Sequence, residues 1–378
     1  MGPIGHNGAR NTSLPLRPRR RRAPVLMDPH DKRWQRGRPS PPALSMERVI
    51  RPSSPLLSMA RLSDIGEKGI VRSLVSMLTV SARLGPGDDA AAVELGDRYL
   101  VASTDMLWEG THFHPRMSRW QRGWMAAAVN LSDIAAMGAQ PLGLLLAMGL
   151  PADLDEGDVK GMVQGAADCC DAYGTDYLGG DTKECPQLVL AGASLGLVGK
   201  EGLLTRKGAS RGDLLMMTGT AGMAAAGLLA LELGIDENRA ITALFEPQPR
   251  VKEGALLSAS GVVTSCTDIS DGLSTSLQEL ALASGTAFEV DRPSVPIGPD
   301  VERIALKAGK DPMDLALHGG GDYQLLFTIR PDGLDRVLDA LGSDARVIGQ
   351  CIGGNRNVLR SGGVRSELEP KGYEHFRR

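Results

Sequence analysis

The spacing of hydrophobic and polar residues predicts helices in the first half of the chain. Residues 63–78 and 120–137 carry apolar side chains at helical spacing. Ser63 is placed to cap the first helix, and Gly138 follows the second as a typical helix end. The second helix is rich in alanine, which indicates that it packs closely against its neighbours.

Short apolar runs between these helices predict strands. Residues 91–95 and 99–104 flank Gly96-Asp97, a dipeptide typical of a tight hairpin turn. The other elements expected before residue 206 are a strand at 142–150, a helix ending near 173, and two strands of which the second covers 187–198.

The same kind of pattern starts again after Arg206-Lys207-Gly208. The expected strands are 214–218, 262–267 and segments near 287 and 325, and the expected helices are 221–233, 251–260, 273–283 and 334–341. Two halves that each mix strands and helices predict an α/β or α+β pair of domains, 59–206 and 207–378.

The first 58 residues differ in composition from the rest of the chain. They carry twelve Lys and Arg against three acidic residues and ten of the 23 prolines. Such a segment buries too little apolar surface to offset the entropy of ordering, so residues 1–58 are expected to be a disordered tail. A targeting peptide or a nucleic-acid arm is possible, but a nonessential extension or an over-long gene model is favoured.

Charge and cysteine content narrow the class of protein. Without the tail the net charge is near −12, which disfavours nucleic-acid binding and suits an enzyme that collects divalent cations. The richest apolar stretch, 141–151, is too short to span a membrane. The five cysteines lack metal-binding spacing and are expected to be buried thiols in the cytoplasm.

Acidic residues gather where the predicted elements end. Asp89 precedes the first strand of the hairpin and Asp105 follows the second, so an antiparallel hairpin brings both carboxylates to its open end. A cation between them would relieve their repulsion. The alternative is a solvated loop, because Asp and Gly are common turn residues.

Three further clusters repeat this combination of acids with small residues. Asn130 and Asp133 lie on one face of the alanine-rich helix, as a polar face aimed at a site or as surface residues. Gly179-Gly180-Asp181-Thr182 is expected to end a strand. Asp268 and Asp271 stand between a strand and a helix, where helix capping explains one of them but not easily both.

Together the clusters predict Mg²⁺ ions on a polyphosphate, because Mg²⁺ takes one or two carboxylates per ion plus phosphate oxygens. No GxxxxGK[ST] motif is present, so a P-loop is excluded. The turn 219–222 could hold a phosphate, although an ordinary strand-to-helix turn is favoured. Arg206 is placed to reach a nucleotide phosphate or to form a surface salt bridge.

These stretches closely resemble the thiamine-monophosphate kinases, which share a superfamily with aminoimidazole ribonucleotide synthetase. The resemblance runs from about residue 61 to 376. It rests on these motifs in this order: GDDAA (87–91), STDMLWEGTHF (103–113), AVNLSDIAAMGAQPLG (128–143), GGDT (179–182), LTRKGA (204–209), DISDGL (268–273) and GGGDYQLLFT (319–328).

The resemblance implies a fold, an activity and a set of site residues. The fold is a two-domain α/β (α+β) aminoimidazole ribonucleotide synthetase-like fold, with the sheets of two N-terminal domains pairing into a barrel in a homodimer. The activity is transfer of the ATP γ-phosphate to thiamine monophosphate, giving thiamine diphosphate. The implied Mg²⁺ ligands are Asp89, Ser103, Thr104, Asp105, Asp133, Asp181, Asp268 and Asp271; the implied ATP contacts are Gly180, Asp181, Arg206 and Ser270; the implied substrate contacts are His112 and Tyr373.

Two residues depart from the pattern of this family. Gly321 and Gln324 stand where acids are usual, which bears on the affinity for a cationic thiazolium. The acceptor phosphate is already anionic near pH 7, so direct transfer needs no general base and no catalytic residue in the narrow sense. The alternatives are another ATP-dependent superfamily enzyme or a non-catalytic nucleotide-binding regulator.

Overall fold

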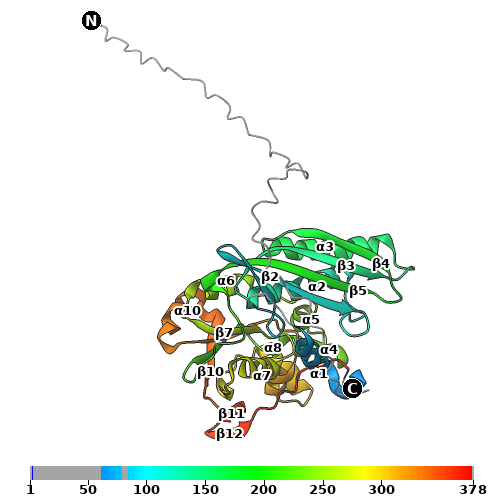
Figure 1. The fold of residues 1–378 in the computed structure, drawn as a ribbon. Coiled ribbons are helices and arrows are strands. Elements are labelled where there is room, and N and C mark those ends of the chain that lie inside the picture. The colour runs from blue at the N-terminus through cyan, green and yellow to red at the C-terminus, as the bar shows by residue number, and fades with distance from the viewer. Residues whose placement is uncertain (1, 3–60, 79–83, 377–378) are drawn as a thin grey trace. The chain divides into compact units, whose positions relative to one another are not determined.

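Two β-sheets organise the part of the chain that the structure describes. The computed structural model describes residue 2, residues 61–78 and residues 84–376. From residue 61 onward these belong to one unit, Ala60–Arg378, in which both sheets lie (Figure 1). The tail predicted at 1–58 lies outside the described residues, apart from Gly2.

The first sheet has five strands and contains the predicted hairpin. Leu95 pairs with Arg98 around Gly96, whose φ of 63° favours glycine, so the two-residue turn is confirmed. The second hairpin strand extends to Trp108, so Asp105 lies within the strand and not after it. The strands, in the spatial order β1-β2-β5-β3-β4, are β1 (Ala91–Leu95), β2 (Arg98–Trp108), β3 (Gln140–Leu150), β4 (Tyr177–Glu184) and β5 (Val189–Gly199).

Three helices accompany this sheet: α1 (Leu62–Met77), α2 (Arg119–Ala136) and α3 (Glu156–Ala172). Helix α2 begins with a capping box between Ser118 and Gln121 and is followed by Gly138 at φ 67°. Helix α1 begins one residue earlier than expected, because Asp64 accepts a hydrogen bond from the backbone N–H of Arg61. The predicted cap at Ser63 is therefore wrong.

The second sheet has seven strands in the order β12-β11-β8-β10-β6-β9-β7. They are β6 (Leu214–Thr218), β7 (Val263–Asp268), β8 (Phe288–Asp291), β9 (Leu325–Ile329), β10 (Ala345–Cys351), β11 (Val358–Ser361) and β12 (Val364–Glu367). The helices of this half are α4 (Met223–Glu232), α5 (Asn238–Phe245), α6 (Val251–Ser260), α7 (Leu273–Ser284), α8 (Pro299–Lys307), α9 (Pro312–His318) and α10 (Leu334–Leu341).

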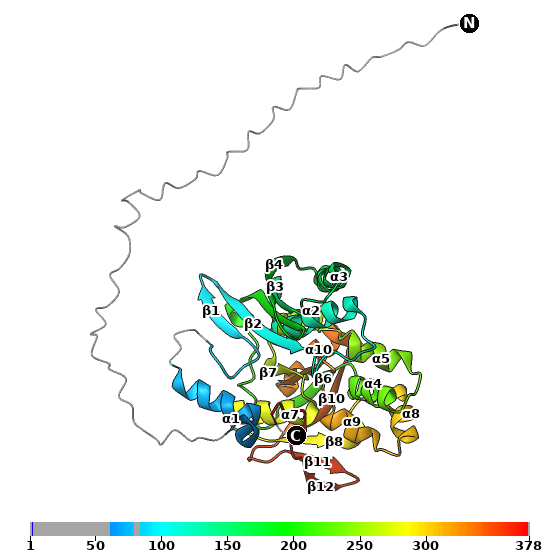
Figure 2. The ribbon, with the colours of Figure 1, turned by 90° about the vertical axis from the view of Figure 1, so that its right-hand side faces the viewer.

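Helix α2 lies between the two sheets and packs on both. It contacts β2, β3 and β5 on one side and β7 and α6 on the other. Its alanines Ala126, Ala127 and Ala128 are at most 1% exposed, so the small side chains permit this close packing. Figures 1 and 2 show α2 and α3 on the same face of the five-stranded sheet.

The cysteines are free thiols, four of them buried and Cys185 partly buried, as expected. In residues 61–78 and 84–376, no helix combines the length and hydrophobicity needed to cross a bilayer.

Candidate active site

A cavity of about 1590 Å³ brings most of the predicted site residues together. Its walls come from α1, the hairpin, α2, the segment before β6, the loop after β7 and residues 373–376. The predicted residues that line it are Asp89, Ser103, Thr104, Asp105, His112, Asp133, Arg206, Asp268, Ser270, Asp271 and Tyr373.

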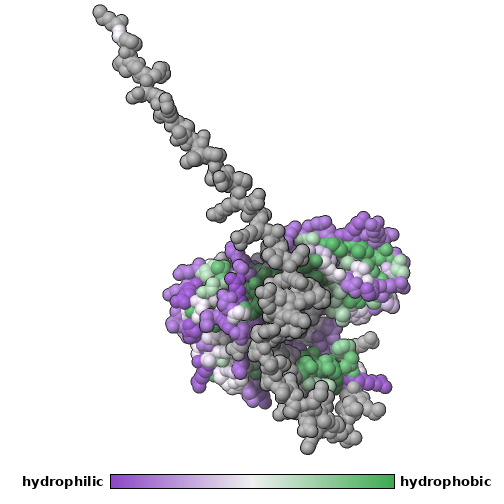
Figure 3. Space-filling model, turned by 45° about the horizontal axis from the view of Figure 1, so that its top comes forward, coloured by the Kyte–Doolittle hydropathy of each residue, from purple (hydrophilic) through white to green (hydrophobic). Residues whose placement is uncertain are grey.

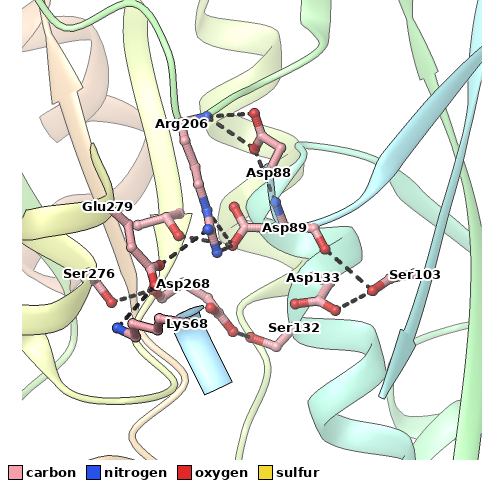
Figure 4. Close-up of polar contacts among 11 residues, drawn as sticks. Lys68, Asp88, Asp89, Ser103, Ser132, Asp133, Arg206, Asp268, Ser276 and Glu279 are labelled. Carbon is pink, nitrogen blue, oxygen red and sulfur yellow. Dashed lines mark hydrogen bonds and ion pairs between the residues drawn. The ribbon is translucent and has the colours of Figure 1, made fainter. Parts of the chain in front are cut away.

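Three carboxylates from three separate elements meet in this cavity. One oxygen each from Asp89, Asp133 and Asp268 lies within 4.8 Å of the others (Figure 4). Asp89 precedes β1, Asp133 lies on α2, and Asp268 ends β7, so packing α2 against both sheets creates the cluster. Three carboxylates at this distance repel one another, which favours a bound cation.

Burial and mutual repulsion raise the pKa values of these acids. Burial raises the pKa of Asp133 well above its ordinary value, and Asp105 and Asp268 add to the shift. Burial likewise raises the pKa of Asp105, of Asp88 to about 7 and of Asp271 to about 6. Near neutral pH these carboxyl groups therefore cannot all be ionised without strong mutual repulsion unless a cation is bound.

Arg206 is the cation bound directly to this centre. Its Nε and Nη2 donate to Asp89 Oδ1 at 3.2 and 2.7 Å, and its Nη1 lies 3.2 Å from Glu279. Thr267 also donates to Asp89 Oδ1, at 2.9 Å, whereas the buried Oδ2 has no partner among the described residues. The side chain of Arg206 is 20% exposed, so its ion pair is not a surface salt bridge.

Small polar residues of α2 hold the other acids in place. Ser132 donates to Asp268 Oδ2 at 2.5 Å, and Asn130 accepts from the backbone N–H of Asp105 at 3.1 Å. Ser103 on β2 donates to Asp133. Asn130 is fully buried, so the polar face predicted for this helix points into the molecule and the surface alternative is wrong.

The loop after β7 does not use its aspartates as helix caps. Helix α7 has Gly272 at its N-cap without a side-chain cap. Asp268 and Asp271 line the cavity instead.

Imidazole and aromatic rings line another part of the cavity. The His112 ring lies 5.5 Å from that of His375, which packs edge-on against Tyr373 at 4.8 Å. His112 uses Nδ1 for hydrogen bonds to Thr111 and Trp108, and burial lowers its pKa. The ring is thus neutral at pH 7, and its Nε2 makes no hydrogen bond to the described residues.

Helix α1 and residues 373–376 close the cavity beside these rings. The backbone N–H of His375 donates to a Glu67 carboxylate oxygen at 3.2 Å, and the backbone N–H of Glu67 donates to the His375 carbonyl at 3.3 Å. Both residues line the cavity, so segments 308 positions apart form one wall.

Two predicted residues lie elsewhere. Gly180 and Asp181 are inside the edge strand β4, not at the end of a strand as expected, and do not line the cavity. The Asp181 side chain is 65% exposed and pairs with Lys183 at 3.0 Å. Their assignment to ATP and metal stays a prediction.

The residues that depart from the family pattern are engaged outside the cavity. Gln324 Oε1 accepts from Arg250 at 2.7 Å and from Thr218 at 3.2 Å. Gly321 has φ 95°, so a side chain there would be strained, and neither residue lines the cavity. Asp322 accepts from the N–H groups of Gly222 and Ala224, so the turn before α4 is filled by a carboxylate and is an ordinary strand-to-helix turn.

Sequence reasoning missed several residues of the cavity. They are Glu67, Asp88, Tyr323, Glu374 and His375. Asp88 adjoins a predicted ligand and binds the backbone N–H of Arg206 at 3.1 Å. Glu374 and His375 likewise follow the predicted Tyr373, whereas Glu67 and Tyr323 join the cavity through contacts distant in sequence, which no local pattern signals.

Comparison with known proteins assigns this architecture to a family. Two models of AIR synthase related proteins match, the N-terminal domain at residues 87–198 and the C-terminal domain at 210–362. The thiamine-monophosphate kinase of Methanospirillum hungatei is 38% identical over 289 residues, which cover 76% of this chain and 92% of that protein. The chain belongs to the thiamine-monophosphate kinase family.

Other members of the thiamine-monophosphate kinase family agree in sequence and fold. The Escherichia coli member is 34% identical over 79% of this chain and 93% of its own length. The solved structure of AaThiL complexed with AMPPCP and TMP is 30% identical, with a TM-score of 0.77, and covers 84% of this chain and 99% of its own. The two-domain α/β fold expected from the sequence is confirmed.

Proposed function

We propose that this protein transfers the γ-phosphate of ATP to thiamine monophosphate, giving thiamine diphosphate and ADP. The observation that carries this is a single cavity lined both by the aspartates and by the rings of His112, Tyr373 and His375. The relatives named thiamine-monophosphate kinases and the AaThiL complex with AMPPCP and TMP support the same assignment.

The donor set suits Mg²⁺, which prefers carboxylate oxygens. Asp89 belongs to the three-carboxylate cluster, and its Oδ2 is buried without a hydrogen-bond partner among the described residues. This oxygen is therefore available to bind a cation. We infer that Asp89, Asp133 and Asp268 hold Mg²⁺, with Asp105, Asp271, Ser103 and Thr104 completing the sites. When bound, Mg²⁺ neutralises the negative charge of the two phosphate chains.

The side chains of this protein would then align the reactants. The acceptor phosphate oxygen forms a bond to the γ-phosphorus while the bond to the ADP oxygen breaks, in line and without a phosphoenzyme. Nδ1 of neutral His112 accepts from the backbone N–H of Trp108, so its Nε2–H would donate a hydrogen bond to the acceptor phosphate. Glu67 offers a carboxylate to the cationic thiazolium, a role that Gly321 cannot fill.

We infer that 59–206 and 207–378 act as two domains that both contribute to this cavity, and that the protein is a homodimer. The face of the five-stranded sheet opposite α2 exposes Val93, Met106, Leu145 and Leu178 at 41–63%. Figure 3 shows hydrophobic surface where Figure 1 places β3, β4 and β5. Apolar faces of this kind are typical of interfaces.

Asp181 supports pairing through this face. It is in register with Ala147, which pairs with Ala191, the partner of Met106, so all four side chains lie on the uncovered face. Met106 at the other end of this row lines the cavity, whereas Asp181 does not. We propose that Gly180 and Asp181 contact ATP and Mg²⁺ in the site of a partner subunit.

A substrate panel tests the function. Purified protein with Mg²⁺ and ATP is offered thiamine monophosphate, free thiamine or aminoimidazole precursors, and ADP and thiamine diphosphate are measured. Only thiamine monophosphate is expected to react, because free thiamine lacks the anionic nucleophile. Comparable turnover of free thiamine would contradict direct transfer to a phosphate, and turnover of a precursor alone would favour another superfamily activity.

A further inference from the structure

Tyr323 has an unusual backbone conformation beside the acidic centre. Its φ is 48°, in the left-handed region that non-glycine residues with bulky side chains rarely occupy. Only one other non-glycine residue of the described chain, Phe376, has a positive φ. Such strain persists only where surrounding contacts impose it, and it is enriched at functional sites.

The surrounding contacts that impose this conformation are hydrogen bonds to the loop after β7. The backbone N–H of Tyr323 donates to the Ile269 carbonyl at 2.9 Å, and that of Gly321 donates to the Ser270 carbonyl at 2.7 Å. The N–H of Ile269 returns a bond to the Gln324 carbonyl at 2.8 Å. Residues on both sides of Tyr323 are therefore fixed to the loop that carries Asp268 and Asp271.

Tyr323 lines the cavity together with Asp105, Asp133, Asp268 and Asp271. Burial raises the pKa of its phenol, and the negative charges of these four carboxylates add to the shift. A phenol is protonated at neutral pH, so it offers a hydrogen-bond donor that adds no charge.

This donor is not used inside the protein. The hydroxyls of Ser103, Ser132 and Thr267 donate to Asp133, Asp268 and Asp89, and that of Thr104 donates to the Gly192 carbonyl. The Tyr323 hydroxyl makes no hydrogen bond to any residue that the structure describes, although four carboxylates line the same cavity. It is therefore available to a ligand of the centre.

We propose that the Tyr323 hydroxyl donates a hydrogen bond to an oxygen of the phosphoryl group during transfer. The inference rests on the proposed function. The carboxylates that line the cavity with Tyr323 are those assigned to Mg²⁺, so phosphate oxygens bound to the ions would lie in the same cavity as its hydroxyl. A donor fixed in advance stabilises the developing charge of the transition state more than the ground state.

Tyr323→Phe tests this, because it removes only the hydroxyl. Tyr177→Phe is the matched control: Tyr177 begins β4, does not line the cavity and has no hydrogen bond through its hydroxyl in the described structure. The expected result is a fall in kcat of roughly 100-fold with the KM for ATP and for thiamine monophosphate nearly unchanged. The control should keep the kinetics of the wild type.

A binding measurement separates this role from a structural one. Calorimetric titrations compare Mg²⁺ with a non-hydrolysable ATP analogue against Mg²⁺, ADP, aluminium fluoride and thiamine monophosphate, which together mimic the transferred phosphoryl group. Tyr323→Phe should bind the first set like the wild type and the second at least 10-fold more weakly. Equal binding of both sets and a kcat within twofold of the wild type would overturn the proposal.

The outcomes also distinguish this inference from the proposed function. If the wild type turns over thiamine monophosphate and Tyr323→Phe matches it, only the role of Tyr323 fails. If the wild type is inert towards thiamine monophosphate, the proposed function itself fails. A loss of both binding reactions together with a lower Tm would show that Tyr323 is structural, which also overturns the proposal.

Discussion

The two oxygens of Asp89 have different surroundings, and this difference shows how the centre is prepared for a cation. Oδ1 receives three hydrogen bonds, from Arg206 and Thr267, whereas Oδ2 is buried without a partner. The donors fix the carboxylate plane before any ion arrives. Arg206 thus has a positioning role in this structure, which leaves its contact with ATP a prediction.

Neutralising one carboxylate of the centre should weaken activity and the binding of Mg²⁺ and ATP, but should make the metal-free fold more stable. Asp105→Asn and Asp133→Asn are each expected to lower kcat/KM by roughly 100-fold or more, while raising the Tm of the metal-free protein by a few degrees, because clustered carboxylates repel. With Mg²⁺ and ATP, the wild type should gain more Tm than either variant.

Asp339→Asn, on the exposed surface of α10, is the control for these two variants and should behave as the wild type. Thermal shifts with and without Mg²⁺ and ATP give the answer. Equal shifts in the wild type and both variants would mean that these acids are structural.

The raised pKa values also predict how stability depends on pH. Asp88 and Asp271 have pKa values of about 7 and about 6 in the folded chain, against an ordinary 3.8. Folding favours the neutral form of both carboxyl groups. Their contribution to the free energy of unfolding is therefore greatest at low pH and is lost as pH rises through the pKa of the folded state.

Metal-free protein should therefore unfold at lower urea concentration at pH 8 than at pH 6, and saturating Mg²⁺ should reduce the difference. Urea titrations at both pH values check this, with Asp88→Asn expected to flatten the dependence. A metal-free protein more stable at pH 8 would contradict the assigned shifts.

At the scale of single residues, the sequence predicted most carboxylates of the acidic centre but not the residues that complete the cavity around them. Asp89, Asp105, Asp133, Asp268 and Asp271 were predictable because each follows a turn or helix signal next to small residues. Tyr323 and Glu67 were not, because a left-handed backbone and a contact between distant segments leave no mark on local spacing. Asp181 was placed in the wrong local context because a glycine pair was taken for the end of a strand.

Among the elements, α2 determines whether the site can form. It reaches both sheets, and it approaches α3 so closely that glycines are required at the crossing. A Cβ on Gly123 would lie 1.8 Å from the Met162 carbonyl oxygen, and one on Gly165 would lie 1.9 Å from that of Trp120. Neither contact can be relieved without moving backbone.

Gly123→Ala and Gly165→Ala should each lower the free energy of unfolding by about 2–3 kcal/mol, because the helices must separate. Gly157→Ala, also on α3, meets nothing within 4 Å and should stabilise by roughly 0.5 kcal/mol through helix propensity. Urea unfolding monitored by circular dichroism measures all three. A neutral Gly123→Ala would show that the crossing is looser than described.

The long, periodic elements were predictable and the short ones were not. The hairpin, α2, β6 and α6 follow clear spacing signals and occur where expected, within a few residues. Sequence analysis missed α5, α8, α9 and β10–β12. Strands β11 and β12 have four residues each and are largely exposed, so they lack the apolar alternation that identifies a strand.

For the whole molecule, the uncovered face of the five-stranded sheet determines the expected assembly. Leu145→Glu places a charge on β3 within that face and should convert a homodimer into a monomer, because burying an unpaired charge is unfavourable. Leu306→Glu, at a side chain 72% exposed on α8, is the control and should leave the assembly unchanged. Light scattering after size exclusion gives the mass of each.

Activity in the same samples tests the role of Asp181. If its carboxylate acts in the partner's site, the Leu145→Glu monomer should lose activity even though its own cavity is intact. A fully active monomer would contradict that role, and a monomeric wild type would contradict the dimer itself.

The wall formed by Glu67 and His375 has a consequence for the synthesis of the protein. These residues are 308 positions apart, and chains are made at about 5–20 residues per second, so His375 is added roughly 15–60 s after Glu67. Every residue of the acidic centre is translated before His375, and the deepest of them, Asp268, precedes it by more than 100 positions. A growing chain can therefore assemble its acidic centre before the adjoining wall of the cavity exists, so metal binding would precede competence for the second substrate within the lifetime of each nascent molecule.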